Sequence, residues 1–461
     1  MSSFRGFSLV FQRNKSMYSL ALTVASKLVT PKSMLHKPVA LVSEEMNGLA
    51  KNIIGLIGSN TPTMNKMTSY YFETEGKKIR PLLILLLSRA LSSIPIEERD
   101  NLNIDSTDFP HKTTDLEAKK SVLYANPISN FSPLHVLSGI GQINALTKEA
   151  LPLPQAKYDE KRGILPKQRR LAEIVEMIHT ASLLHDDVID HADTRRGRPS
   201  VNAVFTNKMA VLAGDFLLGR ATVCVSRLKN PEVIELMSEC IANLVEGEVM
   251  QLHNTPEENM TRSTSFKPFT DMYFPKEEGQ NSKSSISISI KSHEALIDDC
   301  FQHYLQKSFL KTGALISKAC RATAILSGAR QSVIESCYEF GKSLGLCFQL
   351  VDDMLDYTVS EKDLGKPAGN DLKLGLCTAP VFYAWMEDES VGSLIKRNFS
   401  KPGDIDLTLK AVQKHKGLDK TRKLAEAYRD RALNSLEQAL PESDSRSALE
   451  LLTNSILTRK R

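Results

Sequence analysis

Two aspartate clusters, each at the end of an apolar helical run, constrain the fold of this chain more than any other feature. Their members are Asp186, Asp187 and Asp190 in ASLLHDDVID, and Asp352, Asp353 and Asp356 in FQLVDDMLD. Positions four apart lie on one face of a helix, so Asp186 and Asp190 should point the same way, with Asp187 about 100° around the helix. Carboxylates gathered at the end of an apolar helix repel one another and resist burial, so a cation is expected among them.

Hard divalent cations with oxygen ligands fit such clusters best, above all Mg²⁺, which completes its shell with water and substrate phosphate. A single DDxxD is more often an acidic helix end exposed to solvent. Because this chain has a second aspartate cluster with nearly the same spacing, the sequence instead predicts two facing helices that hold metal ions between them.

Short basic segments accompany the acid clusters. They are residues 76–80 (GKKIR), 194–198 (TRRGR), 311–312 (KT), 364–367 (LGKP) and 371–373 (DLK). Each alone is usually a solvated loop. Together with the acid clusters they indicate a site for two diphosphates, one bound through metal and the other by Lys and Arg side chains alone.

Apolar residues recur with helical spacing through most of the remaining chain. Helices are predicted at residues 44–60, 82–91, 167–190, 203–228, 232–252, 293–326, 331–357, 376–385, 404–414, 420–440 and 445–458. Two polar stretches, 98–165 and 254–292, are expected to be insertions in one domain that spans residues 44–461. The predicted fold class is all-α, a helical bundle with the active site in a central cavity between the two Asp-rich helices.

The first 43 residues contain six basic residues and no acid, and they are rich in Ser and Leu, a composition typical of a mitochondrial transit peptide. A disordered basic tail is the alternative. Removing these six leaves 53 of the 59 basic residues against 54 acids, so the body is close to neutral and charge does not favour a nucleic-acid partner. The seven scattered cysteines include no CxxC pair, which fits a reducing compartment such as the matrix.

The chain resembles the trans-type (head-to-tail) polyprenyl diphosphate synthases. The resemblance covers nearly everything from residue 44 onward except the two insertions, and Glu75 departs from it, where the family usually has a second glycine. The motifs that carry it are GKKIRP, IHTASLLHDDVID, DTRRGRP, GDFLLGRA, LKTGAL, FQLVDDMLD and DLGKPAGNDLKLGLCTAP.

The resemblance implies an isoprenoid-synthase helical bundle and a Mg²⁺-dependent transferase with three sets of site residues. The metal ligands are Asp186, Asp187, Asp190, Asp352, Asp353 and Asp356. The allylic diphosphate is contacted by Arg195, Lys311, Thr312, Gln349 and Lys366, and isopentenyl diphosphate by Lys77, Arg80, His179 and Arg196. A lone histidine on an apolar helix is more often a core residue, but the position of His179 two turns before Asp186 favours the functional role.

The physical chemistry agrees with this division. The metal ions held by the aspartates, together with cationic side chains such as Lys311, would withdraw charge from the leaving diphosphate, so that the C–O bond ionises. The allyl cation is then attacked by the double bond of isopentenyl diphosphate held alongside it, and a proton is lost to the departing diphosphate. Water must be excluded, because it would hydrolyse the cation.

The helix that precedes Asp186 is expected to set the product length. Ala181 and Ser182 are small where short-chain synthases place bulky aromatic residues, so the tunnel for the growing chain should be open there, with Ile178 as a deeper wall. The alternative is that these small residues only allow close helix packing. The expected product is a long all-trans polyprenyl diphosphate, hexaprenyl in length, for the ubiquinone tail.

Two other functions compete with this interpretation. A class I terpene cyclase shares the first acid cluster, but it usually replaces the second with an Asn/Ser/Glu triad and needs no second diphosphate site. A non-catalytic partner subunit of a quinone-synthesis complex would tend to have degraded clusters, whereas both are intact here. The resemblance further implies a homodimer in the mitochondrial matrix, with peripheral association with the inner membrane as a further possibility.

Overall fold

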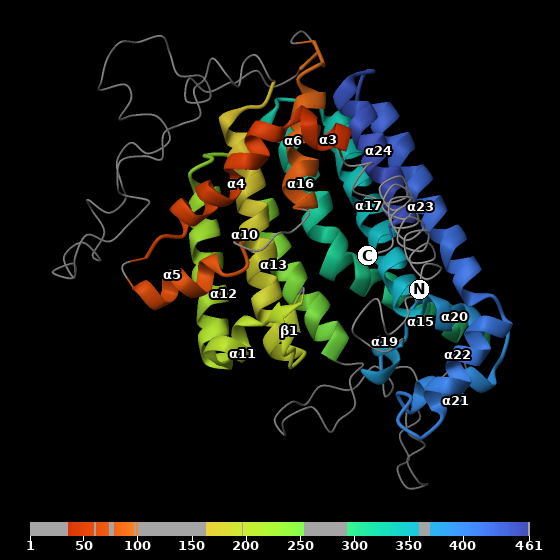
Figure 1. The fold of residues 1–461 in the computed structure, drawn as a ribbon. Helices are drawn as coiled ribbons and strands as arrows, with labels where there is room; N and C mark the ends of the chain where they lie inside the picture. The colour runs from red at the N-terminus through yellow and green to blue at the C-terminus, as the bar shows by residue number, and fades with distance from the viewer. Residues whose placement is uncertain are drawn as a thin grey trace, which may run out of the picture.

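The structure is a computed structural model, and it describes residues 36–59, 61–72, 78–95, 98–99, 163–195, 197–252, 293–358 and 369–459. These residues form a bundle of helices with one antiparallel two-stranded hairpin (Figure 1). The first half comprises α3 (His36–Leu41), α4 (Ser43–Leu56), α5 (Pro62–Ser69), α6 (Ile79–Leu91), α10 (Pro166–Ile189), β1 (Thr194–Arg195), β2 (Arg198–Pro199), α11 (Val201–Phe205), α12 (Asn207–Ser226) and α13 (Pro231–Leu252).

The second half contains the longest helix, α17, and a π-helical segment, η4, which continues directly into α16. Its elements are α15 (His293–Ser308), η4 (Phe309–Gly313), α16 (Ala314–Leu326), α17 (Gln331–Thr358), α19 (Asn370–Lys373), α20 (Ala379–Trp385), α21 (Ser390–Lys396), α22 (Asp404–Lys414), α23 (Gly417–Ala439) and α24 (Asp444–Thr458). The all-α prediction is confirmed.

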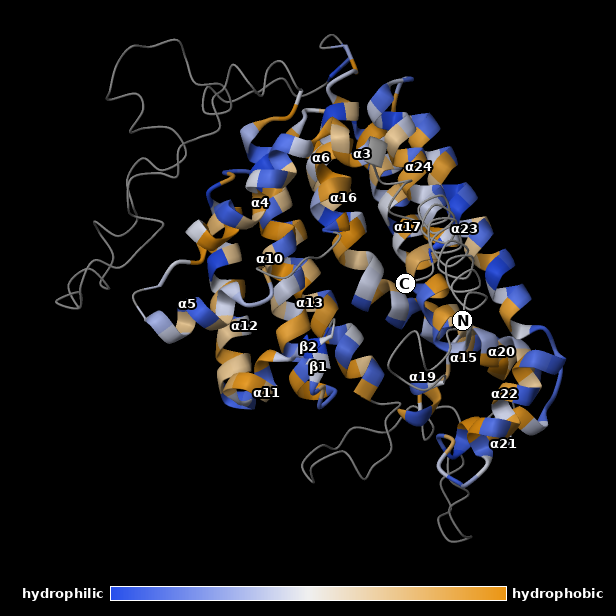
Figure 2. Ribbon diagram, in the orientation of Figure 1, coloured by the Kyte–Doolittle hydropathy of each residue, from blue (hydrophilic) through white to orange (hydrophobic). Residues whose placement is uncertain are grey.

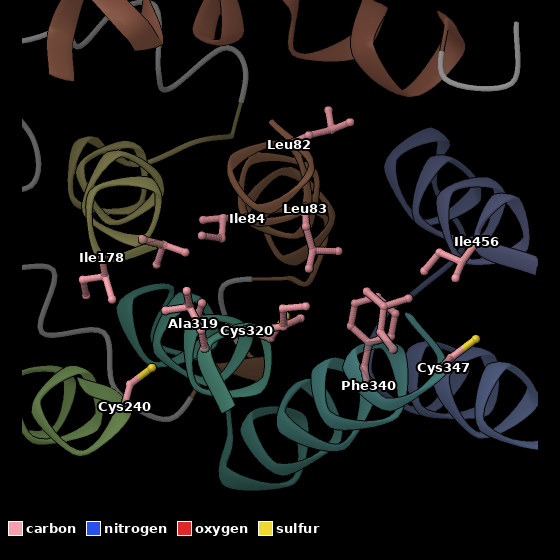
Figure 3. Packing of buried hydrophobic residues seen from close by; sticks show 14 of the residues in the cluster. Leu82, Leu83, Ile84, Ile178, Cys240, Ala319, Cys320, Phe340, Cys347 and Ile456 are labelled. Carbon is pink, nitrogen blue, oxygen red and sulfur yellow. The ribbon is translucent and has the colours of Figure 1, made fainter. Parts of the chain in front are cut away.

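Helix α6 lies in the middle of the hydrophobic core. Its central residues are apolar all round, which suits a helix that is enclosed by neighbours. It packs against α10, α16 and α24. Figure 3 shows Ile84 on the side of α10, where Ile178 lies, and Leu83 on the side of Cys320 and Phe340. All five side chains are buried, so α6 connects the two halves of the bundle through one continuous core.

The outer helices instead carry a single apolar stripe. In α23 the residues that contact the core recur at intervals of three, four or seven, and the other positions are mostly polar or charged (Figure 2). This helix packs against α17 and α20. The buried residues of α23 include Thr421, Ala425, Ala432, Leu436 and Ala439.

Some helix boundaries differ from those that the sequence predicts. The helix expected at 203–228 is divided at Thr206, whose φ of 118° ends α11. The Thr206 hydroxyl then accepts a hydrogen bond from the backbone N–H of Met209 at 3.4 Å, which begins α12. The sequence does not predict α3, α5 and α21, because at 6, 8 and 7 residues they are too short to show a helical period.

Both ends of the first insertion are attached at one place on the bundle. The Arg99 guanidinium donates hydrogen bonds to the carbonyl oxygens of Leu91, Ser92 and Ile94 at the end of α6. Where the chain returns, Gly163 lies so close to Ser92 that a Cβ on the glycine would come within 1.9 Å of the Ser92 hydroxyl oxygen. The chain therefore leaves and re-enters the bundle at neighbouring points. The second predicted insertion, 254–292, lies outside the described residues.

We expect that residues 100–162 can be replaced by a short Gly/Ser linker without loss of the fold. The two attachment points are adjacent, and closing a shorter loop between them should raise the free energy of unfolding by only about 2 kcal/mol. Thermal unfolding and circular dichroism check this. The same replacement combined with Arg99→Ala, which removes the hydrogen bonds at the end of α6, should lower Tm. A linker variant that fails to fold would show that the replaced segment supports the bundle.

Candidate active site

The two acid clusters lie at the same end of the bundle. Helices α10 and α17, which carry them, both run towards the end where β1 and α19 are found (Figure 1). A third helical segment lies between them, since α16 packs against both α10 and α17, and η4 packs against both α13 and α17. The predicted arrangement of two Asp-rich helices around one site therefore agrees with the fold, with η4 as an additional wall.

In the first cluster, Asp187 is fully enclosed. Its carboxylate accepts two hydrogen bonds of 2.8 Å from Arg195 Nε, forms a 2.5 Å ion pair with Arg195 Nη2 and accepts a short hydrogen bond from the Tyr71 hydroxyl. Because Arg195 lies on β1, this pair fastens the hairpin to the end of α10. A metal ion could reach Asp187 only by displacing these donors, so its role as a metal ligand stays a prediction, as does the contact of Arg195 with a diphosphate.

Asp186 and Asp190 face a different set of charges. Burial raises the pKa of Asp186 to about 7, against the opposing effect of Lys311, and the charges of Glu248 and Asp190 add to the rise. Burial also raises the pKa of Asp190, with the same two residues, Lys311 and Glu248, acting on it. The two carboxylates therefore share one face of α10, as their spacing predicts, and a cation close to both would relieve their repulsion.

Lys311 connects α13 to this face. Its ammonium forms a 2.5 Å ion pair with Glu248 Oε2 and donates a hydrogen bond of 3.0 Å to Gln251 Oε1. Burial disfavours the charged form, but Asp186 and Glu248 outweigh it and raise the pKa of Lys311. Helix α13 approaches closely because Gly247 has no side chain: a Cβ there would lie 2.8 Å from the backbone nitrogen of Lys311.

The neighbouring residue, Thr312, connects to the second cluster. Its hydroxyl donates a 2.8 Å hydrogen bond to Gln349 Oε1, and Gln349 Nε2 donates a 2.7 Å hydrogen bond to Asp353 Oδ1. The other oxygen of Asp353 accepts a short hydrogen bond from the Tyr304 hydroxyl. Burial raises the pKa of Asp353 to about 6, while the bonds from Tyr304 and Gln349 and the charge of Lys307 oppose the rise. Asp353 is thus the buried end of a chain of hydrogen bonds.

Asp352 is the exposed member of the second cluster. Its carboxylate accepts a 2.5 Å hydrogen bond from Arg459 Nη2, just beyond the end of α24. The Arg459 guanidinium also lies over the ring of Phe348, 4.1 Å from the ring centroid. The C-terminal end of the described chain therefore contacts the second acid cluster directly.

Asp356 faces α19 instead. Its carboxylate accepts hydrogen bonds from the backbone N–H groups of Asn370 and Asp371, at 3.2 and 3.0 Å. The Asp371 carboxyl lies nearby, and its pKa is raised to about 8 by burial and then by the charges of Asp353 and Asp356. Because its carboxylate already caps α19, Asp356 has fewer free oxygen lone pairs for a metal than Asp352.

Two of the residues predicted to bind isopentenyl diphosphate meet between α6 and α10. Arg80 Nη1 lies 2.9 Å from His179 Nε2, and because arginine can only donate, this imidazole nitrogen accepts. His179 also borders a pocket beside the first cluster, together with Tyr70, Tyr71, Glu176, Thr180, Leu183, Arg195 and Arg198. The predicted ligands Lys77, Arg196 and Lys366 lie outside the described residues.

The residues predicted to set product length lie on α10 within the core. Ala181 and Ile178 have no exposed surface, and Ser182 is half-buried, with its hydroxyl donating to the backbone oxygen of His179 at 2.9 Å. The small side chain of Ala181 is thus surrounded by protein. Its role in product length stays a prediction.

Sequence reasoning missed several residues of this site. Tyr71 and Tyr304 donate to the most buried aspartate of each acid cluster, and Glu248 pairs with Lys311. No local sequence pattern identifies the two tyrosines, because they are 116 and 49 residues from their partners along the chain.

The donor set fits Mg²⁺. Its candidate ligands are carboxylate oxygens, and besides burial the charge of Asp190 contributes to the raised pKa of Asp186. In the part of the chain that the structure describes, no three His, Cys, Asp or Glu side chains converge into a complete metal cage. Mg²⁺ usually keeps several waters and takes further oxygen ligands from substrate phosphate.

Comparison with known proteins identifies the family. A family model described as polyprenyl synthetase matches residues 144–412, more than half of the chain. The chain belongs to the polyprenyl synthetase family. It is 60% identical to the mitochondrial hexaprenyl pyrophosphate synthase of Saccharomyces cerevisiae, over 97% of this chain and 96% of that protein. It is 37% identical to decaprenyl-diphosphate synthase subunit 1 of Schizosaccharomyces pombe, over 91% of each.

Solved structures of this family share its fold. A decaprenyl diphosphate synthase from Rhodobacter capsulatus aligns with a TM-score of 0.62 and 25% identity, over 92% of this chain and 98% of that one. A polyprenyl synthase from Caulobacter crescentus, complexed with calcium and isoprenyl diphosphate, aligns with a TM-score of 0.61 and 24% identity over the same shares. The prediction of an isoprenoid-synthase bundle is confirmed.

Metal binding to this polyprenyl synthetase should strengthen as pH rises through 7. The raised pKa of Asp186 means that the carboxyl is largely protonated below pH 7, so a metal ion must displace a proton there. For one such group the affinity for Mn²⁺, used as a probe, should rise about tenfold between pH 6 and pH 8. Calorimetric titration in buffers of different ionisation enthalpy measures both the affinity and the proton release.

The matched control is Asp186→Asn, which removes the titrating group. Its Mn²⁺ affinity should be lower and should vary much less between pH 6 and pH 8. Equal pH dependence in the variant and the wild type would show that another group titrates.

Proposed function

We propose that this prenyltransferase condenses isopentenyl diphosphate head to tail with an allylic diphosphate such as farnesyl diphosphate, and that its product is hexaprenyl diphosphate for the ubiquinone tail. One observation carries the proposal: two complete acid clusters lie at the same end of the bundle and are joined through Lys311 and Thr312. The 60% identity to a hexaprenyl pyrophosphate synthase supports the product length.

The residues divide into two groups around this site. Lys311 and Thr312 are held at opposite walls by Glu248 and Gln349, where they can bind the allylic diphosphate and orient its leaving oxygen. Arg80 and His179 lie on the α6–α10 side and would hold isopentenyl diphosphate alongside. Water must be kept from the carbocation, because it would hydrolyse it.

We infer that Mg²⁺ is the metal and that Asp186, Asp190 and Asp352 are its principal ligands. Asp352 is exposed, and Asp186 and Asp190 share one face of α10. When bound, Mg²⁺ would draw negative charge from the leaving diphosphate. Asp187, Asp353 and Asp356 remain predicted ligands, each with other donors in the structure.

A product assay tests the function. The purified chain without its presequence would receive farnesyl diphosphate, labelled isopentenyl diphosphate and Mg²⁺, and the dephosphorylated product would be sized by mass spectrometry. A C30 product is expected. The relative from Schizosaccharomyces pombe is named as a subunit, and a lack of incorporation by the folded chain alone would favour a partner-subunit role here.

Ala181→Phe should shorten the product sharply, because a phenylalanine at this buried position of α10 would block the path of the growing chain. The measurement is the same sizing by mass spectrometry. Ala172→Phe is a control, since Ala172 is also fully buried on α10 but lies more than two turns further from Asp186. An unchanged product length in Ala181→Phe would contradict the tunnel role.

We infer that the protein is a homodimer formed through α12 and α13. These adjacent helices, with α11, expose more apolar residues than a solvated face requires. Helix α12 also has the length and apolar composition of a membrane-crossing segment, with 39% of that stretch buried, and its other side packs against α10. The exposed residues are Val204, Val211, Leu212, Val223, Val245 and Val249.

Leu212→Glu should convert the dimer to a monomer, because it places a charge in the apolar face. Light scattering after size-exclusion chromatography gives the mass. Leu407→Glu is the matched control: Leu407 is 53% exposed and Leu212 is 52% exposed, but Leu407 lies on α22. If both variants keep the wild-type mass, α12 is not the interface.

We also propose a mitochondrial location on the matrix side, with peripheral contact with the inner membrane, supported by the mitochondrial names of the similar fungal synthases. Helix α3 lies within the first 43 residues, yet it packs against α6 and α24, and Val42 has no exposed surface. The transit peptide would therefore end before α3 rather than at residue 43. Import of the 1–35 segment fused to a reporter tests this.

A further inference from the structure

The surface around α22 carries an excess of positive charge. Residues 396–416 extend from the last turn of α21 to the residue before α23, and within them Arg397 pairs with Asp404 at 2.6 Å. Asp406 is the only other acid of this segment. The chain after the presequence is close to neutral as a whole, so the excess is local. Every lysine of the segment is exposed: Lys396, Lys401, Lys410, Lys414 and Lys416.

The neighbouring acids do not compensate these lysines. Asp388 Oδ2 lies 3.6 Å from His415 Nε2, and Glu387 pairs with Lys420 of α23 at 2.6 Å. Within the described residues, none of the five lysines forms an ion pair. Their charges therefore remain available to an external anion.

Helix α22 presents several of these charges on one outer face. It packs against α20, α21 and α23, and the residues that it buries are Asp404, Thr408 and Val412. Residues three or four positions apart share a helix face, and Leu407, Lys410 and Lys414 follow this spacing on the other side. Leu407 is 53% exposed, so the outer face combines lysines with one apolar side chain.

This surface lies near the active site. Helix α22 is found at the end of the bundle where α19 lies, far from α4 (Figure 1). The second acid cluster is at the same end, because Asp356 caps α19. A partner that binds the outer face of α22 would therefore be close to the place where the product is made.

A lipid surface with anionic headgroups fits this combination of side chains. Clusters of about four to eight basic residues on an amphipathic helix are typical of proteins that bind such surfaces. A lysine acts as a point charge and needs no fixed partner geometry, which suits mobile headgroups. Nucleic acid fits less well, because it also needs exposed rings on which bases stack. Phe399, the only Phe, Tyr or Trp of residues 396–416, is buried.

We propose that the outer face of α22, with the five lysines on and beside it, is the surface through which the protein docks on an anionic bilayer. The inference rests on the proposed contact with the inner membrane and names the residues that make it. The C30 chain of the proposed product is apolar, so docking here brings its synthesis to the lipid that can receive it.

Co-sedimentation with lipid vesicles tests the proposal. The probes are vesicles of phosphatidylcholine and phosphatidylglycerol at about four to one, whose surface is anionic, and vesicles of phosphatidylcholine alone. The chain is used without its presequence, because the six basic residues of that segment would themselves bind anionic vesicles. It should bind the anionic vesicles, and it should not bind those of phosphatidylcholine alone.

The double variant Lys410→Gln/Lys414→Gln should lower the partition coefficient on anionic vesicles about 25-fold, which corresponds to about fivefold for each lysine. Asp406→Asn should raise it about fivefold, because it removes the one free acid of the segment. All these positions are exposed, and circular dichroism checks that each variant is folded.

Lys51→Gln/Lys229→Gln is the matched control. Both lysines are exposed; Lys51 lies on α4 and Lys229 lies between α12 and α13, and the net charge changes by the same amount. Its partition coefficient should stay within about twofold of the wild type. Equal losses in the two double variants, no loss in either, or no gain in Asp406→Asn would overturn α22 as the docking surface and leave the membrane contact standing.

The wild type decides the membrane contact itself. Failure to bind anionic vesicles, or binding to a single-stranded oligonucleotide in their place, overturns both the docking surface and the membrane contact on which it rests. The experiment uses neither substrate nor metal, so a negative result in the product assay would not change its outcome.

Discussion

The structure depends on how a bundle with an apolar core tolerates six aspartates at one end. The solution is the same in both clusters. The second aspartate of each DD pair is buried, and a tyrosine from a distant helix or turn donates a hydrogen bond to it: Tyr71 to Asp187 and Tyr304 to Asp353. Asp187 also pairs with Arg195, and Asp353 also accepts a hydrogen bond from the amide of Gln349. The protein itself compensates these two charges permanently.

The first member of each pair is therefore the better candidate for binding a metal ion. Asp186 and Asp352 are more open than Asp187 and Asp353; Asp186 is close enough to Lys311 to feel its charge, and Asp352 pairs with Arg459 near the end of the described chain. A carboxylate that is fully engaged by fixed donors is a poor ligand, whereas one that lacks a fixed donor gains most from an added ion. The different surroundings of the two aspartates in each DD pair thus follow from burial, because the helix turns one member of each pair inward.

Sequence periodicity predicts the parts of this arrangement that are local. It places Asp186 and Asp190 on one face and identifies the long helices, because these follow from spacing along one helix. Periodicity does not predict contacts between residues that are far apart along the chain. The spacing gives no reason to treat Asp187 differently from the other aspartates, and only the fold brings Tyr71 to it. The same applies to Thr206, where a single residue with positive φ divides a helix that is continuous in its apolar pattern.

The segment between the clusters shows how backbone geometry, rather than side-chain chemistry alone, makes one site from two. Consecutive residues of a helix point in different directions, so Lys311 can face α13 and the first cluster while Thr312 faces α17. Lys311 and Thr312 reach their partners only because α13, η4 and α17 are almost in backbone contact. A Cβ on Gly345 would lie 2.6 Å from the Cα of Gly313. The π-helical turn at η4 adds one residue to the ring between hydrogen-bonded groups, which widens the helix where these two side chains diverge. A bulkier residue at Gly345 would push α17 outward, and the bond from Thr312 to Gln349 would be the first to break.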